Sequence, residues 1–335
     1  MTDMNRRVVL QQRPSGAPRN ADFAVLEVPL EDLGPDSVTV RVDTLSVDAF
    51  IRTTLDEREG IHGVAPLGGP VVALGVGQVS ASTSEALREG DWVSGPLMAQ
   101  THAQLPAGML QKIEPGEIIP PRTFLGVLGM TTGLTAWVGM VEIAGVQAGD
   151  TVVVSGAAGA VGSVAGQIAK ARGARVIGIA GGPHKVAYLT DTLGLDAGID
   201  YKQEDPAERI KALAPHGVDV YFDNVGGELL DTVLDNLAVG GRVSLCGAIS
   251  QYEHLDDVRG PKLYLRLAER NATMRGFTVD HYPQRFAQAA QELSGLMVDG
   301  RLVLPEHVME GIDQFPEALI TLLNGGHMGK MLVVP

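Results

Sequence analysis

The sequence predicts an α/β protein in which a doubly wound parallel sheet is joined to a domain of short β-strands. Its length of 335 residues suggests two domains, at about 150 residues each. Apolar and polar residues alternate as in strands up to about residue 125, whereas apolar strands alternate with helical patterns after it. We therefore expect residues 126–301 to form the sheet domain, and residues 1–125 with 302–335 to form the other.

The first domain is predicted to be a barrel-like set of short strands. Residues 37–42 alternate strictly, which places their valines on one face. Glycine and proline clusters punctuate this region and predict turns between strands. These clusters lie at residues 14–18, 66–70 and 90–96.

The second domain is predicted from runs of Val and Ile that are continuous rather than alternating, as in strands buried on both faces. Helical patterns separate these runs, which is typical of right-handed βαβ units. The expected order is strand 151–155, helix 161–171, strand 175–180, helix 185–193, strand 218–222, helix 228–237 and strand 241–246. A helix at 284–297 follows, and strand-like segments 303–308 and 330–334 are expected to complete the first domain's barrel.

Composition excludes several classes of partner. The chain has 26 Lys and Arg against 40 Asp and Glu, a formal charge of −14, so nucleic acid and anionic membranes are not expected partners. The only cysteine, Cys246, rules out an intramolecular disulfide and a Cys-rich zinc site. We expect no metal, and, since no targeting segment is visible, a cytoplasmic location.

A glycine-rich turn between the strand 151–155 and the helix 161–171 is the strongest functional signal. Small residues there let backbone N–H groups and a helix N-terminus approach a pyrophosphate. We expect dinucleotide binding, although a methyl donor would suit the same turn. The candidate residues are Gly156, Ala157, Gly159, Ala160, Val161 and Gly162, with Ala157 where the first glycine of the fingerprint would stand.

The end of the second strand favours NADPH over NADH. NAD-binding units usually place an acidic residue about 20 residues after the glycine turn, to bind the ribose 2′-hydroxyl. Residues 178–184 contain no acid, and Lys185 follows directly, with Tyr201 as a further candidate. A 2′-phosphate would be attracted there, although a lysine at the start of a helix is often merely solvated.

Five segments resemble the zinc-free medium-chain dehydrogenases/reductases, and among them the alkenal, prostaglandin and curcumin reductases. They are LGVLGMTTGLTA (125–136), SGAAGAVGS (155–163), YFDNVGG (221–227), CGAISQY (246–252) and MGK (328–330). The resemblance implies a GroES-like barrel, a Rossmann domain, an active-site cleft between them and a homodimer. It also implies cofactor contacts at Met130, Thr135, Asn224, Cys246, Gly247, Ala248, Ile249, Phe277, Val279 and His327. Five of these could equally be core or strand-edge structure, namely Asn224, Cys246, Gly247, Phe277 and Val279, and His327 could instead be an exposed loop residue.

The chemistry implied by this resemblance is reduction of an α,β-unsaturated aldehyde or ketone by NADPH. Without a metal, the carbonyl must be polarised by hydrogen-bond donors while hydride reaches the β-carbon. Tyr252 is the expected donor, with Tyr264 as a second candidate and packing against substrate as the alternative role. Quinone reduction, or cofactor binding without catalysis, are the competing functions.

This chain departs from the family pattern at three places. Phe50 stands where a Tyr is common, so it can line a substrate pocket but cannot donate a hydrogen bond. His327 stands where an Asn commonly contacts the nicotinamide. The segment around Met130 is one residue longer than usual. We expect a substrate preference that differs from the well-known members.

Overall fold

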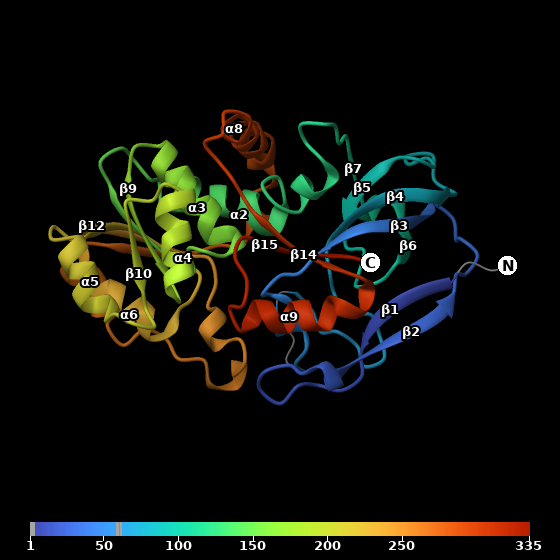
Figure 1. Cartoon of the computed structure of the whole chain (residues 1–335), viewed down its shortest axis with the longest axis horizontal. Coiled ribbons are helices and arrows are strands. Elements are labelled where there is room, and N and C mark those ends of the chain that lie inside the picture. Colours follow the sequence, from blue (N-terminus) through green and yellow to red (C-terminus); the bar gives the residue numbers. More distant parts are fainter. Residues whose placement is uncertain (1–3, 58–59, 61) are drawn as a thin grey trace. The chain divides into compact units, whose positions relative to one another are not determined.

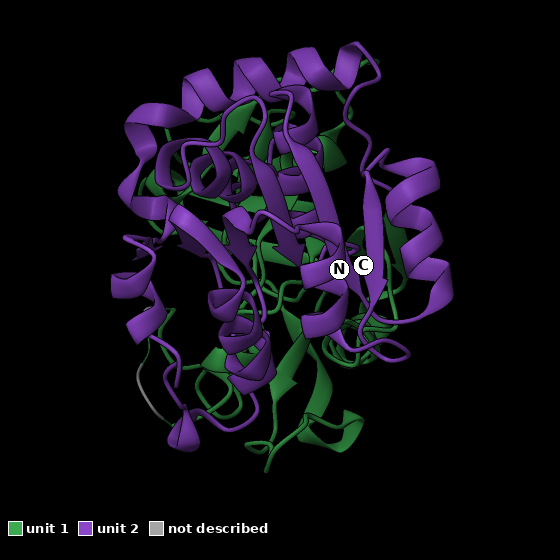
Figure 2. Ribbon diagram, turned by 90° about the vertical axis from the view of Figure 1, so that its left-hand side faces the viewer, with its two compact units in different colours: residues 1–125, 306–335 green, residues 126–305 purple. Residues whose placement is uncertain are grey.

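The computed structural model describes residues 4–57, 60 and 62–335. Contacts between residues divide the chain into two compact units, coloured green and purple in Figure 2. Unit 1 comprises Met1–Leu125 and Glu306–Pro335, and unit 2 comprises Gly126–Pro305. Within the described residues, no helix is both long and apolar enough to cross a membrane.

Unit 2 is built on a six-stranded parallel sheet, as predicted. The strands lie in the order β10-β9-β8-β11-β12-β13. Their bounds are β8 Thr151–Ser155, β9 Arg175–Ala180, β10 Ala197–Asp200, β11 Val218–Asp223, β12 Leu237–Leu245 and β13 Thr273–Gly276. The chain thus builds outward from β8 to β10 and returns to β11 on the other side of β8. The carboxyl ends of β8 and β11 mark the topological switch point, where open α/β sheets bind ligands.

Both faces of this sheet are covered by helices, which explains the continuous apolar runs. Alternate residues of one strand enter different cores, since Val152 and Val154 pack with α3 and α8 while Val153 packs with α5 and α6. Figure 1 labels these helices on the coloured ribbon. Their bounds are α2 Thr135–Trp137, α3 Ala160–Ala171, α4 Pro183–Ala187, α5 Pro206–Leu213, α6 Gly227–Asp235, α7 Leu265–Glu269 and α8 Phe286–Val298.

Three segments of unit 2 form π-helical turns, at Met130–Leu134, Val138–Ile143 and Tyr188–Thr192. A π-turn accommodates one extra residue within a helix. The segment that begins at Met130 forms the first of these π-turns. The helix predicted at 185–193 is confirmed as a continuous helical segment, in which α4 ends at Ala187 and a π-turn follows directly to Thr192.

Other element boundaries also differ from the prediction. Helix α6 ends at Asp235, and Leu237 already begins β12, so the predicted helix end at 237 is wrong. The strand predicted at 303–308 begins only at Glu306. Phe277 and Val279 do not alternate along a strand, because β13 ends at Gly276 and Val279 begins a 3-10 turn.

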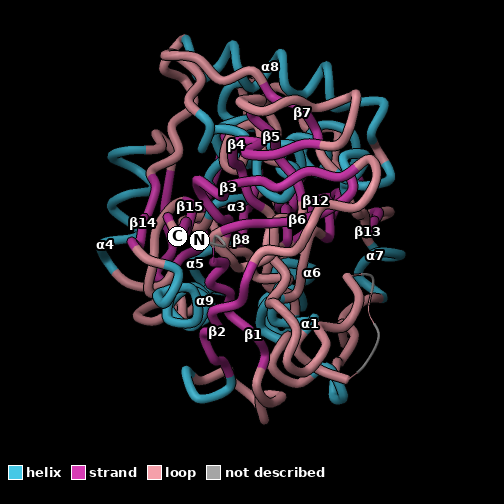
Figure 3. The backbone as a smooth tube through the Cα atoms, turned by 90° about the vertical axis from the view of Figure 1, so that its right-hand side faces the viewer, coloured by secondary structure: helices cyan, strands magenta, loops and turns pink. Residues whose placement is uncertain are grey.

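Unit 1 is a mainly antiparallel β unit whose strands are magenta in Figure 3. A seven-stranded sheet runs β14-β15-β3-β4-β5-β7, with β6 also paired to β3, and β1 and β2 form a separate hairpin. The bounds are β1 Met4–Leu10, β2 Phe23–Pro29, β3 Ser37–Ser46, β4 Gly75–Ser82, β5 Trp92–Gly95, β6 His102–Pro106, β7 Gln111–Ile113, β14 Glu306–Glu310, β15 Lys330–Val334, α1 Ile51–Thr54 and α9 Phe315–Leu323. The predicted return of the C-terminal strands is confirmed, because β15 pairs with β3.

Candidate cofactor and active site

The glycine turn after β8 forms the shape that the sequence predicted. Gly156 has φ +58°, and a Cβ added to Gly162 would lie 2.3 Å from the carbonyl oxygen of Gly156. Gly159 is the N-cap of the 12-residue helix α3, and no side chain caps that end. No acidic residue occupies its first turn. The first N–H groups of α3 therefore form a site suited to a phosphate, with Ala160 and Val161 beside them.

Ala157 has a different place from the one expected for a cofactor contact. Its amide donates to the carbonyl of Ile179 on β9 at 3.1 Å, and its side chain is fully buried. It supports the turn from behind, so the prediction that it contacts the dinucleotide is not supported by its geometry. Its Cβ packs against Gly178, where an added Cβ would lie 2.9 Å away, so the side chain of Ala157 leaves room only for glycine at 178.

A basic cluster lies at the ends of β9 and β10. A Cβ added to Gly181 would lie 2.8 Å from the ring of Tyr201 and 2.9 Å from Cε of Lys202, so both side chains cover this glycine. Burial, and then the charge of Lys202, lower the pKa of Lys185. Lys202 was missed in the sequence because its proximity depends on β10 lying beside β9. Three side chains here therefore suit an anion, namely Lys185, Tyr201 and Lys202.

The ends of β8 and β11 are joined by side chains. Ser155 Oγ donates to the Asp223 carboxylate at 2.9 Å and accepts the Asn224 N–H at 2.9 Å. Asn224 Nδ2 donates to the Ser155 carbonyl at 2.7 Å. Asn224 thus lies at the switch point, although its amide is engaged with the protein. Asp223 and Ser155 are further residues that the sequence analysis did not single out.

Tyr252 is held directly above the backbone that follows β12. Its hydroxyl accepts the Ala248 N–H at 3.3 Å, and a Cβ on Gly247 would lie 2.9 Å from the hydroxyl oxygen. Burial raises the pKa of Tyr252, so the phenol stays protonated at neutral pH. Since the oxygen already accepts one hydrogen bond, its own proton is left to donate. Ile249 lies in the intervening 3-10 turn.

Cys246 does not have the properties of a nucleophile. The side chain is partly buried against the core, and burial, followed by the charge of Asp223, raises the pKa of the thiol to about 12. Its amide and that of Gly247 both donate to the Asp223 carbonyl, at 2.8 and 3.1 Å. These two residues therefore shape the turn through their backbone.

The remaining predicted contacts of unit 2 fall into two groups. Thr135 Oγ1 donates to the Met130 carbonyl at 2.7 Å, which ties the two residues together across the π-turn. Phe277 packs on Gly139, and Val279 is buried in the core, so both have packing roles in this structure. Tyr264 is 58% exposed at the start of α7, which gives its proposed catalytic role no support.

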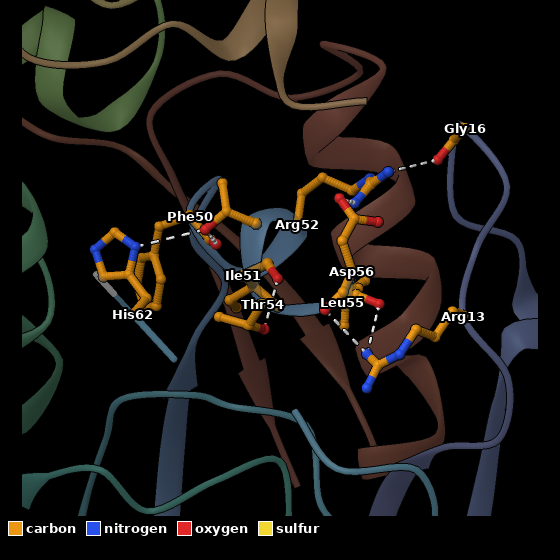
Figure 4. Close-up of polar contacts among 10 residues, drawn as sticks. Arg13, Gly16, Phe50, Ile51, Arg52, Thr54, Leu55, Asp56 and His62 are labelled. Atoms are coloured by element: carbon orange, nitrogen blue, oxygen red, sulfur yellow. Dashed lines mark hydrogen bonds and ion pairs between the residues drawn. The ribbon is translucent and has the colours of Figure 1, made fainter. Parts of the chain in front are cut away.

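Phe50 and His327 belong to unit 1. Phe50 lies just before α1, and its ring centroid is 4.5 Å from that of His62, as Figure 4 shows. Buried charges flank it, because Lys330 Nζ donates to Asp48 at 2.7 Å and Arg52 Nη1 donates to Asp56 at 2.9 Å. His327 is partly buried in the turn before β15.

No metal site is evident in the part of the chain that the structure describes, where no group of three or more His, Cys, Asp or Glu residues could hold an ion.

Comparison with known proteins identifies the family. Residues 6–113 match the family described as "N-terminal domain of oxidoreductase", and residues 160–295 match the family described as "Zinc-binding dehydrogenase". The chain is 34% identical to the NADP-dependent 2-alkenal reductase of Nicotiana tabacum, over 98% of this chain and 97% of that protein. It belongs to the medium-chain dehydrogenase/reductase family. The predicted family and fold class are thereby confirmed.

Two solved structures extend the comparison. CurA from Vibrio vulnificus, in complex with NADPH, is 36% identical, has a TM-score of 0.92, and covers 98% of each chain. A quinone oxidoreductase of Pseudomonas syringae is 27% identical with a TM-score of 0.77, over 99% of this chain and 100% of that chain. The chain thus shares its architecture with CurA and with a quinone oxidoreductase.

Proposed function

We propose that this oxidoreductase reduces the carbon–carbon double bond of α,β-unsaturated aldehydes and ketones with NADPH. The NADP dependence of the tobacco enzyme and the NADPH complex of CurA bear out the predicted cofactor. The residues present fit that cofactor, because the uncapped start of α3 suits a pyrophosphate and the lysine cluster suits a 2′-phosphate. When bound, NADPH supplies the hydride that reaches the β-carbon of the substrate.

The observation that carries this proposal is the Tyr252 hydroxyl. It is neutral and oriented by the Ala248 N–H, so its proton can be donated to the carbonyl oxygen as enolate charge develops. The protein then needs no acid of low pKa, because solvent can protonate the α-carbon.

The test is an assay of NADPH consumption with a panel of enals, enones and quinones. The near-ultraviolet absorbance of NADPH reports the rate. We expect saturated carbonyl products, with deuterium from labelled NADPH at the β-carbon. Tyr252→Phe should lower kcat on the order of 100-fold, as for loss of one oxyanion donor, while NADPH affinity survives. Turnover of quinones but not of enones would favour the alternative that the Pseudomonas structure suggests. Zinc independence, a homodimer and a cytoplasmic location remain predictions.

A further inference from the structure

Asp223 is a fully buried carboxylate that the proposed chemistry does not use. Its Oδ1 accepts hydrogen bonds from Ser155 Oγ at 2.9 Å, Tyr221 Oη at 2.7 Å, Val225 N at 2.9 Å and Gly226 N at 3.0 Å. Each of these four donors is neutral. A buried carboxylate satisfied by neutral donors holds them in one arrangement, because leaving it unsatisfied is costly.

The carboxylate fixes the backbone of residues 223–226. This backbone is hydrogen-bonded to residues 246–250, which lead to Tyr252. The carbonyls of residues 223–225 accept every hydrogen bond that joins the two turns. These bonds are Cys246 N to Asp223 O at 2.8 Å, Gly247 N to Asp223 O at 3.1 Å, Ile249 N to Asn224 O at 3.1 Å, and Ser250 N and Oγ to Val225 O at 3.2 and 2.6 Å. The Tyr252 hydroxyl rests on this same segment, at Gly247 and Ala248.

We propose that Asp223 is a positioning residue for Tyr252, acting through the turns at 223–226 and 246–250. This inference rests on the proposed function, because it assigns Asp223 to the reaction that Tyr252 assists. The substitution Asp223→Asn keeps the volume of the side chain but replaces the carboxylate by a neutral amide. It weakens the acceptor at Oδ1, and an amide nitrogen at Oδ2 would face Gly226 N, which is 3.2 Å from that atom.

The same strand offers a matched control. Asp219 also lies on β11 and also joins it to β8, because its Oδ2 accepts the Thr151 N–H at 2.8 Å. Thr151 is at the amino end of β8 and Ser155 is at its carboxyl end, so the two bonds lie at opposite ends of the strands. Asp219 is only partly buried, so Asp219→Asn controls for the loss of a carboxylate that joins the same two strands, without touching either turn.

The kinetic experiment compares Asp223→Asn, Asp219→Asn, Tyr252→Phe and the double variant Asp223→Asn/Tyr252→Phe in the full chain. We expect Asp223→Asn to lower kcat roughly 10- to 100-fold, the range known for outer-shell partners of metal ligands. Asp219→Asn should stay within about 2-fold of the parent, as remote, uncoupled sites do. In the Tyr252→Phe background, Asp223→Asn should lower kcat only about 2-fold or less, because the effects of substitutions at coupled residues do not add. The inference would be overturned if the fold-losses in kcat of the two single variants multiplied fully in the double variant. Equal losses in kcat for Asp223→Asn and Asp219→Asn would also overturn it.

A second readout does not require turnover. Hydrogen exchange of the amides of residues 246–250 should be faster in Asp223→Asn than in Asp219→Asn, with the amides of α8 unchanged in both. Unchanged exchange at 246–250 would overturn the inference even if an enone is reduced. If the wild-type protein reduces no enone but exchange at 246–250 is still faster in Asp223→Asn, the proposed function fails while the structural link from Asp223 to the Tyr252 turn stands. If Asp223→Asn does not fold, Ser155→Ala takes its place in both measurements, because it removes a donor to the carboxylate and also the acceptor of the Asn224 N–H in the turn.

Discussion

The two units handle charge differently. In unit 1, buried charges are paired within the protein, since Lys330 and Asp48 form an ion pair with 1% and 9% of their side chains exposed. In unit 2, the buried Asp223 is satisfied by neutral donors, and Lys185 has another lysine as its electrostatic neighbour. A neighbouring cation disfavours the charged form of a lysine, whereas an anionic partner favours it. The difference teaches that the Lys330–Asp48 pair stabilises the interior of unit 1, whereas the lysines at the ends of β9 and β10 in unit 2 are placed where a phosphate would favour their charged forms.

The sharpest way to break this comparison is Lys330→Met. The substitution leaves the Asp48 carboxylate in the interior without its cation and hydrogen-bonded to the Ser46 hydroxyl, which we expect to destabilise the protein by about 3–5 kcal/mol. Urea unfolding followed by tryptophan fluorescence measures it. The double variant Asp48→Asn/Lys330→Met should recover much of the loss, because no buried charge then remains. A single variant within about 1 kcal/mol of the parent would contradict the assigned role of the pair.

The next effect concerns the cations of unit 2. Lys185→Ala should weaken NADPH binding by about 1.5–3 kcal/mol, as for a lost hydrogen bond to a charged group, with NADH binding unchanged. Lys202→Ala should have a smaller effect, because that residue is exposed and solvent screens its charge. Calorimetric titration gives both constants, with the exposed Lys211→Ala as the control. Equal losses for NADPH and NADH would show that these lysines do not bind a 2′-phosphate.

Much of the fold was predictable because it depends on local patterns. Continuous Val runs such as 152–154 indicated strands buried on both faces, and the small residues from Gly156 to Gly162 indicated the phosphate turn. The missed features depend on strand order instead. Lys202 meets Gly181 only because β10 lies beside β9, and Ser155 meets Asp223 across 68 residues of sequence. Periodicity carries no information about either pairing.

The errors have a related cause. Phe277 and Val279 alternate in the sequence, but β13 ends at Gly276, where its pairing partner β12 also ends at Leu245. A strand stops where its neighbour stops, whatever the pattern beyond it. The helix predicted at 185–193 formed, but its change to i→i+5 bonding at Tyr188 was not predictable, because a π-turn has almost the same apolar spacing as an α-helix over five residues.

A smaller effect tests the neutral half of the comparison. Tyr221→Phe removes one of four donors to Asp223 Oδ1, so we expect a loss of stability of about 1 kcal/mol, well below that of Lys330→Met. The remaining donors keep the carboxylate satisfied, and kcat should change little. Urea unfolding of Tyr221→Phe and Lys330→Met under the same conditions gives the ratio of their losses of stability. A loss as large as that of Lys330→Met would mean that a carboxylate with several neutral donors tolerates the loss of one partner no better than an ion pair does.

The smallest effect is a pH dependence of NADPH affinity. The pKa of Lys185 in the folded, ligand-free protein is lowered from 10.5, by burial first and by Lys202 second. Between that lowered pKa and 10.5 the unfolded chain binds more protons at Lys185 than the native state does. Its contribution to stability therefore increases with pH in this window.

Binding of NADPH has the opposite dependence on pH. The 2′-phosphate favours the charged ammonium, so affinity should fall as pH rises through the lowered pKa of Lys185, below the pH at which an ordinary lysine titrates. Calorimetry of NADPH binding at a series of alkaline pH values measures this fall. Lys185→Arg should keep the affinity level over the same range, because a guanidinium stays charged, and NADH should show no such fall with either protein. A parallel fall in the Arg variant would assign the titration to another group, and Lys202 is then the nearest cation to test.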